Sequence, residues 1–499
     1  MTQARGGCCP DRLVRVATAI VLVSIAVAAG ACREHAASSA PESSSELRIG
    51  WGLGQATSTN PNIGLRQLSQ RLSFEGLART GEDGRMLPSL AESWTPGPDG
   101  RSLTVKLRPG ITFHDGSRAN ADVVASILPG ALKSFLGTLG SMVESVKASG
   151  SDSVTITFHE RTPFLSESLE APIQKPNGIG TGAFKTTSNS TTELVSHDEY
   201  YLGAPTLKRV HVETFPSIRT AWAEMLRDRI DMLYEVGSDA LDSMQNSSRA
   251  ALFTYNRPYQ YVLVMNTRTP ALAAPIVRRS LSLAIDRDEI VRTALNGYGI
   301  ASSGPIWPKH WAFSAALPKY EFDPAAATRG LAKPMKLTCL MPPDSPFERI
   351  AIAMKRQLAA VGVDLVPEEV SLDELSKRAE RGTYEALLME LISGQSLFRP
   401  YIVWHSQGPF NLGKFGTSTS DAALDRVRHA QTDEEYRSAV AGLQQNFMDD
   451  PPAIFLAWSV RARAVSRRFV VPAAEPGRDV VSTMRLWKPA GGDLRASRN

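Results

Sequence analysis

Residues 335–366 constrain the fold of this chain more than any other stretch, because they read as a complete β-α-β unit. Apolar side chains stand at every second position from 335 to 341, which is the period of a strand. From about 346 to 360 apolar residues return every three or four positions, which predicts an amphipathic helix, and a second strand follows at 363–366. Strands joined in this way are parallel and covered by helices, so an α/β lobe is predicted here.

The ends of this predicted helix carry their own signals. Ser345 and Glu348 match a capping box, and Pro346 stands at the first helical position, where its missing N–H costs nothing. Gly362 suits the end of the helix because glycine adopts a left-handed conformation readily. Cys339 shares the apolar face of the first strand, so we expect it to fill the core rather than to react.

The chain is too long for one core and carries further strand patterns. At 499 residues it exceeds the roughly 250 to 300 residues that a single hydrophobic core organises, so two or more lobes are expected. Alternating apolar residues predict half-buried strands at 103–107 and 154–158, and a first strand is predicted at 47–54. The run 261–266 is apolar without alternation, which is typical of a strand covered on both faces.

Three blocks of sequence occur in the same order as in a known family. The first, residues 74–124, contains FEGL, DGR with MLPSLAESW, LRPGITFHDG and NADVV; the second begins at residue 180 with GTGAF and ends with RDRIDMLYEV; the third is VRRSLSLAIDRDEIV. Over residues 46–470 the chain resembles the family 5 extracellular solute-binding proteins, the capture subunits of ABC importers for peptides and related solutes.

Several residues inside these blocks are better explained by packing than by chemistry. Gly180 and Gly182 suit a chain reversal, where a positive φ costs glycine little. Asp286 and Glu289 form a plausible cap for a short helix. One apolar stripe of the preceding helix is made of Val277, Leu281, Ala284 and Ile285.

The resemblance implies an architecture. It is an α/β, two-lobed periplasmic-binding-protein-like fold of the hinge-closing type II, with an extra subdomain in the first lobe and a ligand cleft between the lobes. The implied segments are a lipoprotein signal peptide at 1–31, a flexible tether at 32–45, a first lobe at 46–258 with the subdomain at about 81–178, a second lobe at 259–458, and a return to the first lobe at 459–499.

The first 31 residues read as an export signal. Three arginines precede an apolar run at 16–31, which is shorter than the roughly 20 residues of a membrane-spanning helix, and Ala29-Gly30-Ala31 supplies the small residues before a cleavage site. Cys32 follows, in an order that resembles a bacterial lipobox, although Ala29 stands where the pattern favours leucine. We expect Cys32 to be lipidated, so that the protein is anchored to the membrane by lipid only; simple secretion is the alternative.

Two stretches are candidates for ligand contact. The resemblance places the polar loop of Thr57, Ser58, Thr59 and Asn60 beside the cleft. Residues 390–415 offer aromatic and polar side chains from the second lobe. The candidates there are Glu390, Ser393, Gln395, Phe398, Tyr401, Trp404 and His405.

The second stretch departs from the peptide-binding pattern. Peptide-binding members usually carry an Asp-rich segment there, one carboxylate of which pairs with the ligand's α-ammonium, whereas this chain has Ser393-Gly394-Gln395-Ser396. Glu390 could substitute, or it could be a solvated carboxylate near a strand end. Trp404 is a candidate aromatic wall, and His405 is either a metal or chelate ligand or a surface or stacking histidine.

Other function classes find little support. The sequence has no G-x-S-x-G, H-E-x-x-H or Walker motif, so we expect a binder rather than an enzyme, with no cofactor and no metal. Cleavage before Cys32 would leave 52 basic and 50 acidic residues, which gives no footprint for nucleic acid. We expect a monomer that delivers a peptide-like solute to ABC permease subunits. Alternatives are an oligosaccharide or metal-chelate binder, and a sensor or envelope chaperone without transport.

Overall fold

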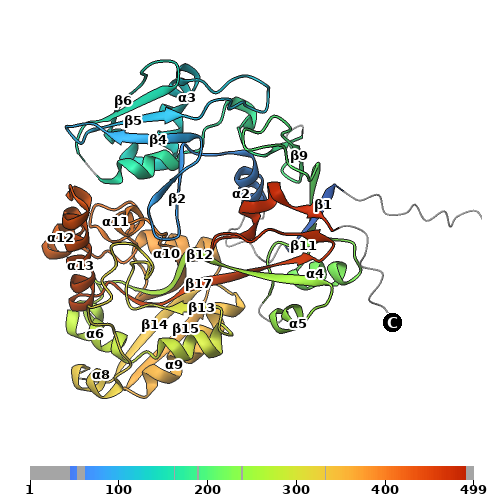
Figure 1. Ribbon diagram of the computed structural model, residues 1–499. Helices are drawn as coiled ribbons and strands as arrows, with labels where there is room; N and C mark the ends of the chain where they lie inside the picture. Colours follow the sequence, from blue (N-terminus) through green and yellow to red (C-terminus); the bar gives the residue numbers. More distant parts are fainter. Residues whose placement is uncertain are drawn as a thin grey trace, which may run out of the picture. The chain divides into compact units, whose positions relative to one another are not determined.

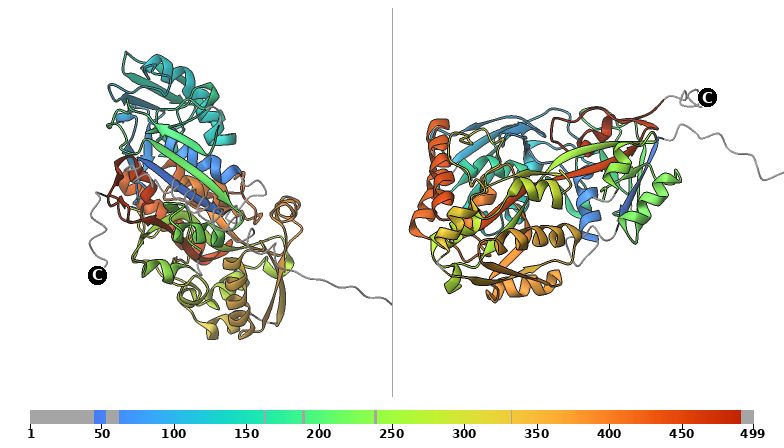
Figure 2. Two further views of the ribbon diagram at one scale, coloured as in Figure 1. Left: turned by 90° about the vertical axis from the view of Figure 1, so that its right-hand side faces the viewer. Right: turned by 90° about the horizontal axis from the view of Figure 1, so that it is seen from below.

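Two long strands, β12 (Ala250–Met265) and β17 (Ala453–Ser466), cross the centre of the molecule (Figure 1). The computed structural model describes residues 45–52, 62–161, 163–187, 190–237, 240–331 and 333–490. The two strands pair antiparallel and lie side by side in the right-hand view of Figure 2, and we call them the crossing strands. Their register shifts between Asn256 and Gln260. The division of the lobes at residues 258 and 459 stays a prediction.

The second lobe lies on one side of the crossing strands. Strand β16 (Ala386–Ile392) pairs antiparallel with β12, and β14 (Met335–Met341) and β15 (Val363–Glu369) extend the sheet in parallel, while β13 (Gly299–Ala301) pairs with β17. The α-helices of this lobe are α6 (Pro275–Leu283), α7 (Arg287–Glu289), α8 (Pro324–Gly330), α9 (Ser345–Ala359), α10 (Leu372–Arg381), α11 (Phe398–Trp404), α12 (Ser418–His429) and α13 (Asp433–Asp449).

The predicted β-α-β unit is confirmed as β14, α9 and β15. Side chains of β14 enter two different cores, since Cys339 belongs to one buried cluster and Leu340 to the other, and each is 0% exposed. The capping box at Ser345 and Glu348 is wrong, because the helix begins one residue earlier and Asp344 takes the N-cap position without a side-chain cap bond. Gly362 is confirmed at the helix end with φ of 81°.

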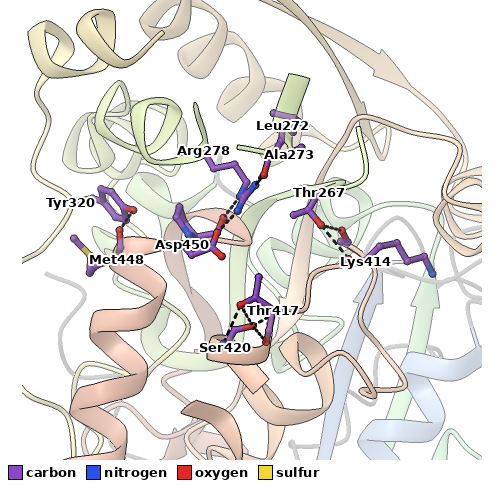
Figure 3. A network of polar contacts seen from close by, with 12 residues as sticks. Thr267, Leu272, Ala273, Arg278, Tyr320, Lys414, Thr417, Ser420, Met448 and Asp450 are labelled. Carbon is purple, nitrogen blue, oxygen red and sulfur yellow. Dashed lines mark hydrogen bonds and ion pairs between the residues drawn. The ribbon is translucent and has the colours of Figure 1, made fainter. Parts of the chain in front are cut away.

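A buried arginine ties the start of α6 to the end of α13 (Figure 3). Arg278 is 2% exposed, and its guanidinium donates to the carbonyl oxygens of Leu272 and Ala273 at 2.6 Å each. The same guanidinium forms an ion pair with Asp450. The guanidinium of Arg278 therefore finds its partners within the protein, and these contacts hold the second lobe together.

The predicted helix cap at Asp286 is confirmed, because the Asp286 side chain accepts from the Glu289 amide.

The first lobe lies on the other side of the crossing strands. Beyond β17 its strands follow in the order β11, β1, β10, β9 and β8. Its elements are β1 (Glu46–Gly52), α2 (Asn62–Ser73), β8 (Phe184–Thr186), β9 (Glu193–Ser196), β10 (Arg209–Phe215), α4 (Ile218–Leu226), β11 (Met232–Leu233), α5 (Leu241–Gln245), β18 (Phe469–Val470) and β19 (Lys488–Pro489). One 11-stranded sheet therefore runs through both lobes.

The glycines that open the second sequence block are needed for close approach and not for a positive φ. Gly180 and Gly182 are absent from the positive-φ glycines of the described chain. A Cβ on Gly180 would lie 2.1 Å from the carbonyl oxygen of Ser73, and one on Gly182 would lie 2.5 Å from that of Leu72. Since a backbone atom at that distance leaves no room for a methyl group, these glycines let the chain pass against the end of α2.

The subdomain is a separate four-stranded antiparallel sheet in the order β4-β5-β7-β6. It has its own apolar core, and the alternating strands predicted at 103–107 and 154–158 are confirmed in it. Its elements are β2 (Ala78–Thr80), β3 (Met86–Pro88), β4 (Ala91–Pro96), β5 (Ser102–Leu107), α3 (Ala121–Leu136), β6 (Val143–Ala148), β7 (Ser153–Phe158) and the 3₁₀ helices η2 (Gly137–Met142), η3 (Pro163–Glu170) and η4 (Pro176–Gly178). In the described ranges, no helix is both long enough and apolar enough to cross a membrane.

Candidate functional site

The subdomain touches the second lobe through polar side chains and one turn. Two carbonyls of the turn between β2 and β3 accept hydrogen bonds from the second lobe. The Glu82 carbonyl accepts from the indole N–H of Trp307 at 2.8 Å, and the Asp83 carbonyl accepts from the backbone amide of Trp311 at 2.9 Å. We call this contact the subdomain interface. Its subdomain residues are Glu82, Asp83, Arg85, Glu160 and Glu167, and its second-lobe residues are Trp307, Trp311, Ser396, Arg428 and Asp433.

Charged pairs close two edges of this interface. Arg85 lies 3.0 Å from Asp433 at the start of α13, and its guanidinium stacks 4.1 Å from the centre of the Trp311 ring. On α12, Arg428 forms an ion pair with Glu160 of the subdomain. These side chains reach across from opposite sides, so they part if the lobes separate.

Glu390 is buried and already paired inside the protein. Its side chain is 4% exposed and lies 2.8 Å from Arg257 and 3.2 Å from Arg461, which also contacts Glu235 at 3.2 Å. Burial by itself would raise the pKa of Glu390, but the two guanidinium groups outweigh it and hold the pKa below its ordinary value. The solvated-carboxylate reading is therefore wrong. Because Arg257 and Arg461 compensate its charge, Glu390 has no need of a ligand ammonium.

The Ser393–Ser396 segment is attached to a crossing strand and to the subdomain. The amides of Ser393 and Gly394 both donate to the Pro258 carbonyl at 3.1 Å, next to the register shift of β12. The Ser393 hydroxyl lies 3.4 Å from the Gln260 side chain. At the other end of the segment, Ser396 reaches across the subdomain interface.

Gln395 contributes its backbone carbonyl to the contact with the subdomain. A Cβ on Gly84, whose φ is 82°, would lie 2.5 Å from the Gln395 carbonyl oxygen, so the β2–β3 turn approaches this segment closely only because residue 84 is glycine.

Glu167, in η3 of the subdomain, is a site residue that the sequence reasoning missed. Its Oε1 accepts the Ser396 hydroxyl at 2.7 Å, whereas Oε2 is buried without a hydrogen-bond partner among the described residues. Burial raises the pKa of Glu167 to about 7, although the Ser396 hydrogen bond opposes the shift. No sequence signal separates Glu167 from the nearby Glu170, because the fold alone turns one of them toward Ser396.

Arg399 is a second missed residue, on α11 beside the same segment. Its guanidinium stands 5.5 Å from the Phe398 ring centre and 5.8 Å from that of Phe135 in the subdomain. Burial lowers the pKa of Arg399, and the negative charges of Glu170 and Glu167 only partly offset this. Its guanidinium makes no ion pair or hydrogen bond among the described residues, which is unusual for a half-buried cation.

The aromatic candidates on α11 belong mainly to the core of the second lobe. Phe398, Tyr401 and Trp404 are 3%, 6% and 2% exposed. Trp404 packs edge-on against Phe447 and Phe455, with ring centres 6.5 and 5.5 Å apart. This packing leaves Trp404 no free face for a solute in this conformation.

Tyr401 and His405 organise the neighbouring polar edge. The Tyr401 hydroxyl accepts from Arg428 at 2.9 Å and donates to Asp425 at 3.3 Å, which orients the arginine that meets Glu160. His405 stacks on Tyr401 at 4.8 Å, and its Nδ1 accepts the Gln407 amide at 3.0 Å. The stacking alternative fits these contacts. Among the described residues, no group of three or more His, Cys, Asp or Glu side chains is arranged to hold a metal ion.

The remaining predicted residues lie outside the described ranges. These are Cys32, Thr57, Ser58, Thr59 and Asn60, together with the signal segment and most of the tether. Their roles stay predictions.

Comparison with known proteins places this architecture. The family model described as bacterial extracellular solute-binding proteins, family 5 Middle, matches residues 85–409. The glutathione-binding protein GsiB of Pectobacterium atrosepticum is 24% identical over 83% of this chain and 88% of its own length. The oligopeptide-binding protein AppA of Bacillus subtilis is 22% identical over 94% of this chain and 97% of its own.

A solved structure shares the fold. The ABC transporter substrate-binding protein CtaP of Listeria monocytogenes has a TM-score of 0.78 at 21% identity, covering 90% of this chain and 100% of that one. The predicted two-lobed α/β fold class is confirmed by this likeness. Because the family match spans more than half of the chain, the protein belongs to the family 5 bacterial extracellular solute-binding proteins.

Proposed function

We propose that this protein is the substrate-binding component of an ABC importer, and that it captures a peptide-like solute outside the cytoplasmic membrane and delivers it to the permease. The observation that carries the proposal is the contrast between a continuous sheet through both lobes and a subdomain interface made of side-chain contacts and the hydrogen bonds of one turn. Such an interface can open while the crossing strands stay paired.

Solute binding would shift a population between open and closed forms. A solute that contacts the subdomain and the second lobe together binds only the closed form fully, so its differential affinity sets the extent of closure. No covalent chemistry is needed for this cycle.

The peptide-like class is supported by relatives over nearly the full chain. AppA of Bacillus subtilis is an oligopeptide-binding protein, and its solved structure holds a nonapeptide. A closed interface lined by hydrogen-bonding groups suits the amide units of such a solute, because water can fill the space around varied side chains.

The test is to identify the solute that leaves with the purified protein. The full chain is purified without denaturation, the solute is released by heat and measured by mass spectrometry, and the radius of gyration is measured by X-ray scattering before and after the solute returns. We expect an amide-containing solute and a smaller radius when it is bound. An oligosaccharide or a metal chelate would contradict the peptide-like class, and an unchanged radius would contradict closure.

We further propose that the protein is exported, monomeric and held at the membrane by lipid on Cys32. Radiolabelled palmitate incorporation in cells tests the anchor. Label is expected in the wild type and not in Cys32→Ser, and equal labelling of both would remove the lipid proposal.

A further inference from the structure

Four consecutive residues of the β2–β3 turn, 82–85, contact the second lobe. The carbonyls of the first two accept the hydrogen bonds described above, and the carboxylate of Glu82 lies 3.4 Å from Lys309 Nζ. Arg85 contributes both an ion pair with Asp433 and a stacked contact on Trp311. The turn therefore brings hydrogen bonds, charge and aromatic packing together in one short segment of the subdomain interface.

Hydrogen bonds within the turn hold its shape. The Gly81 amide donates to the Arg85 carbonyl at 2.7 Å, and the Gly84 amide donates to the Gly81 carbonyl at 3.1 Å. The Asp83 side chain accepts from the Arg85 amide at 3.0 Å. Because these bonds lie inside the subdomain, the turn is already ordered before it meets the second lobe, and its docking costs little conformational entropy.

Gly84 sets how far the turn can enter the second lobe. A Cβ on it would lie 2.5 Å from the Gln395 carbonyl oxygen and 2.5 Å from Cδ2 of the His310 ring, and His310 is only 4% exposed. Gly116 of the same subdomain has a φ of 81°, against 82° for Gly84, but a Cβ on Gly116 would meet nothing within 4 Å. Substitution therefore strains the backbone equally at both glycines, and only at residue 84 does it obstruct the interface.

We propose that the β2–β3 turn is a closure latch, which stabilises the closed form through contacts between protein groups and requires glycine at residue 84. Latch contacts and solute contacts add in the closed form, so the latch raises the affinity for any solute that needs closure. This inference rests on the proposed function, because it concerns the closure on which that function depends.

Zero-length cross-linking with a water-soluble carbodiimide tests the latch without any solute. The reagent joins Lys309 to Glu82 only while the turn is docked, so the rate of this product reports how often the latch forms. The full chain is freed of solute by extensive dialysis, and the product is quantified by peptide mass spectrometry. The exposed pair of Lys208 and Asp198, 2.8 Å apart within the first lobe, is the internal standard.

The main variant is Gly84→Ala, and its matched control is Gly116→Ala. Arg85→Gln is a second variant, which introduces no backbone strain. Circular dichroism checks that each variant is folded. Overpacking should slow the cross-link in Gly84→Ala by roughly tenfold or more relative to the wild type and Gly116→Ala. Loss of the ion pair and of the stacked contact should slow it by roughly threefold in Arg85→Gln.

A rate equal to that of the wild type in folded Gly84→Ala, or in Arg85→Gln, would overturn the latch. If Gly84→Ala does not fold, Arg85→Gln decides. Absence of the product from the wild type, while Lys208 still joins Asp198, would overturn the latch as well. Because no solute enters this measurement, its failure leaves the proposed capture of a solute standing, and the identification of the solute by mass spectrometry tests that function separately.

Discussion

The crossing strands and the subdomain interface both contain charged side chains, but they hold them in opposite ways. The side chain of Arg463, on β17, is 2% exposed, and that of its partner Asp479 is 8% exposed. At the subdomain interface, those of Arg85 and Asp433 are 46% and 61% exposed. In these two pairs, the charges that stay together through a hinge motion are buried and matched, whereas the charges that must part keep access to water, where parting costs little. Glu167 is the exception at the interface, because its Oε2 is buried.

Among the variants that compare the two regions, Asp479→Asn should cause the largest loss of unfolding free energy. It leaves the Arg463 guanidinium buried without its counter-charge, which costs about 3 to 5 kcal/mol of unfolding free energy. Urea denaturation of the two proteins measures the difference. A loss below about 1 kcal/mol would mean that the buried pair is no stronger than a surface pair.

The pH dependence of closure should be next in size. The pKa of Glu167 is raised by burial from 4.5 to about 7, so the closed, solute-free form binds a proton that the opened or unfolded chain has already released. The closed form is therefore favoured most at low pH. Its free-energy advantage over the open form falls by about 3 kcal/mol as the pH rises from 4.5 to beyond about 7.

X-ray scattering without solute checks this prediction. The radius of gyration should be larger at pH 8 than at pH 5 in the wild type, and the change should disappear in Glu167→Gln. A change of the same size in the variant would assign the effect to other groups.

Ser396→Ala should have a smaller effect, confined to the subdomain interface. It removes the hydroxyl that Glu167 Oε1 accepts at 2.7 Å, so closure and solute affinity should weaken by about 1 kcal/mol, or about fivefold. Calorimetric titration with the solute identified above measures the affinity. Urea denaturation should show little change, and a large loss of stability there would place this hydrogen bond among the contacts that hold the lobes themselves.

The smallest effect is expected for Asp433→Asn. Its ion pair with Arg85 is exposed on both sides, so its removal should change the unfolding free energy by less than about 1 kcal/mol. Urea denaturation of Asp433→Asn and Asp479→Asn side by side compares the loss of unfolding free energy at the subdomain interface with the loss at the crossing strands. Equal losses in the two variants would break the contrast between the regions.

Local patterns in the sequence predicted the elements, and distant contacts decided the site. The β-α-β unit at 335–366 was readable because periodicity and helix ends are encoded within a few residues. Glu167 and Ser396 are 229 residues apart, so no local pattern joins them. The face of Glu390 was equally hidden, because its strand is apolar on both sides and has no period of two.

Hydrogen exchange at two sets of backbone amides tests the central claim most directly. The Trp311 amide donates across the subdomain interface to the Asp83 carbonyl, whereas amides of β12 and β17 lie in the sheet that joins the lobes. With the identified solute absent and then present, we predict that the Trp311 amide changes from fast to slow exchange while the crossing-strand amides exchange slowly in both states. An equally protected Trp311 amide in both states, or crossing strands that gain protection to the same extent, would contradict the account.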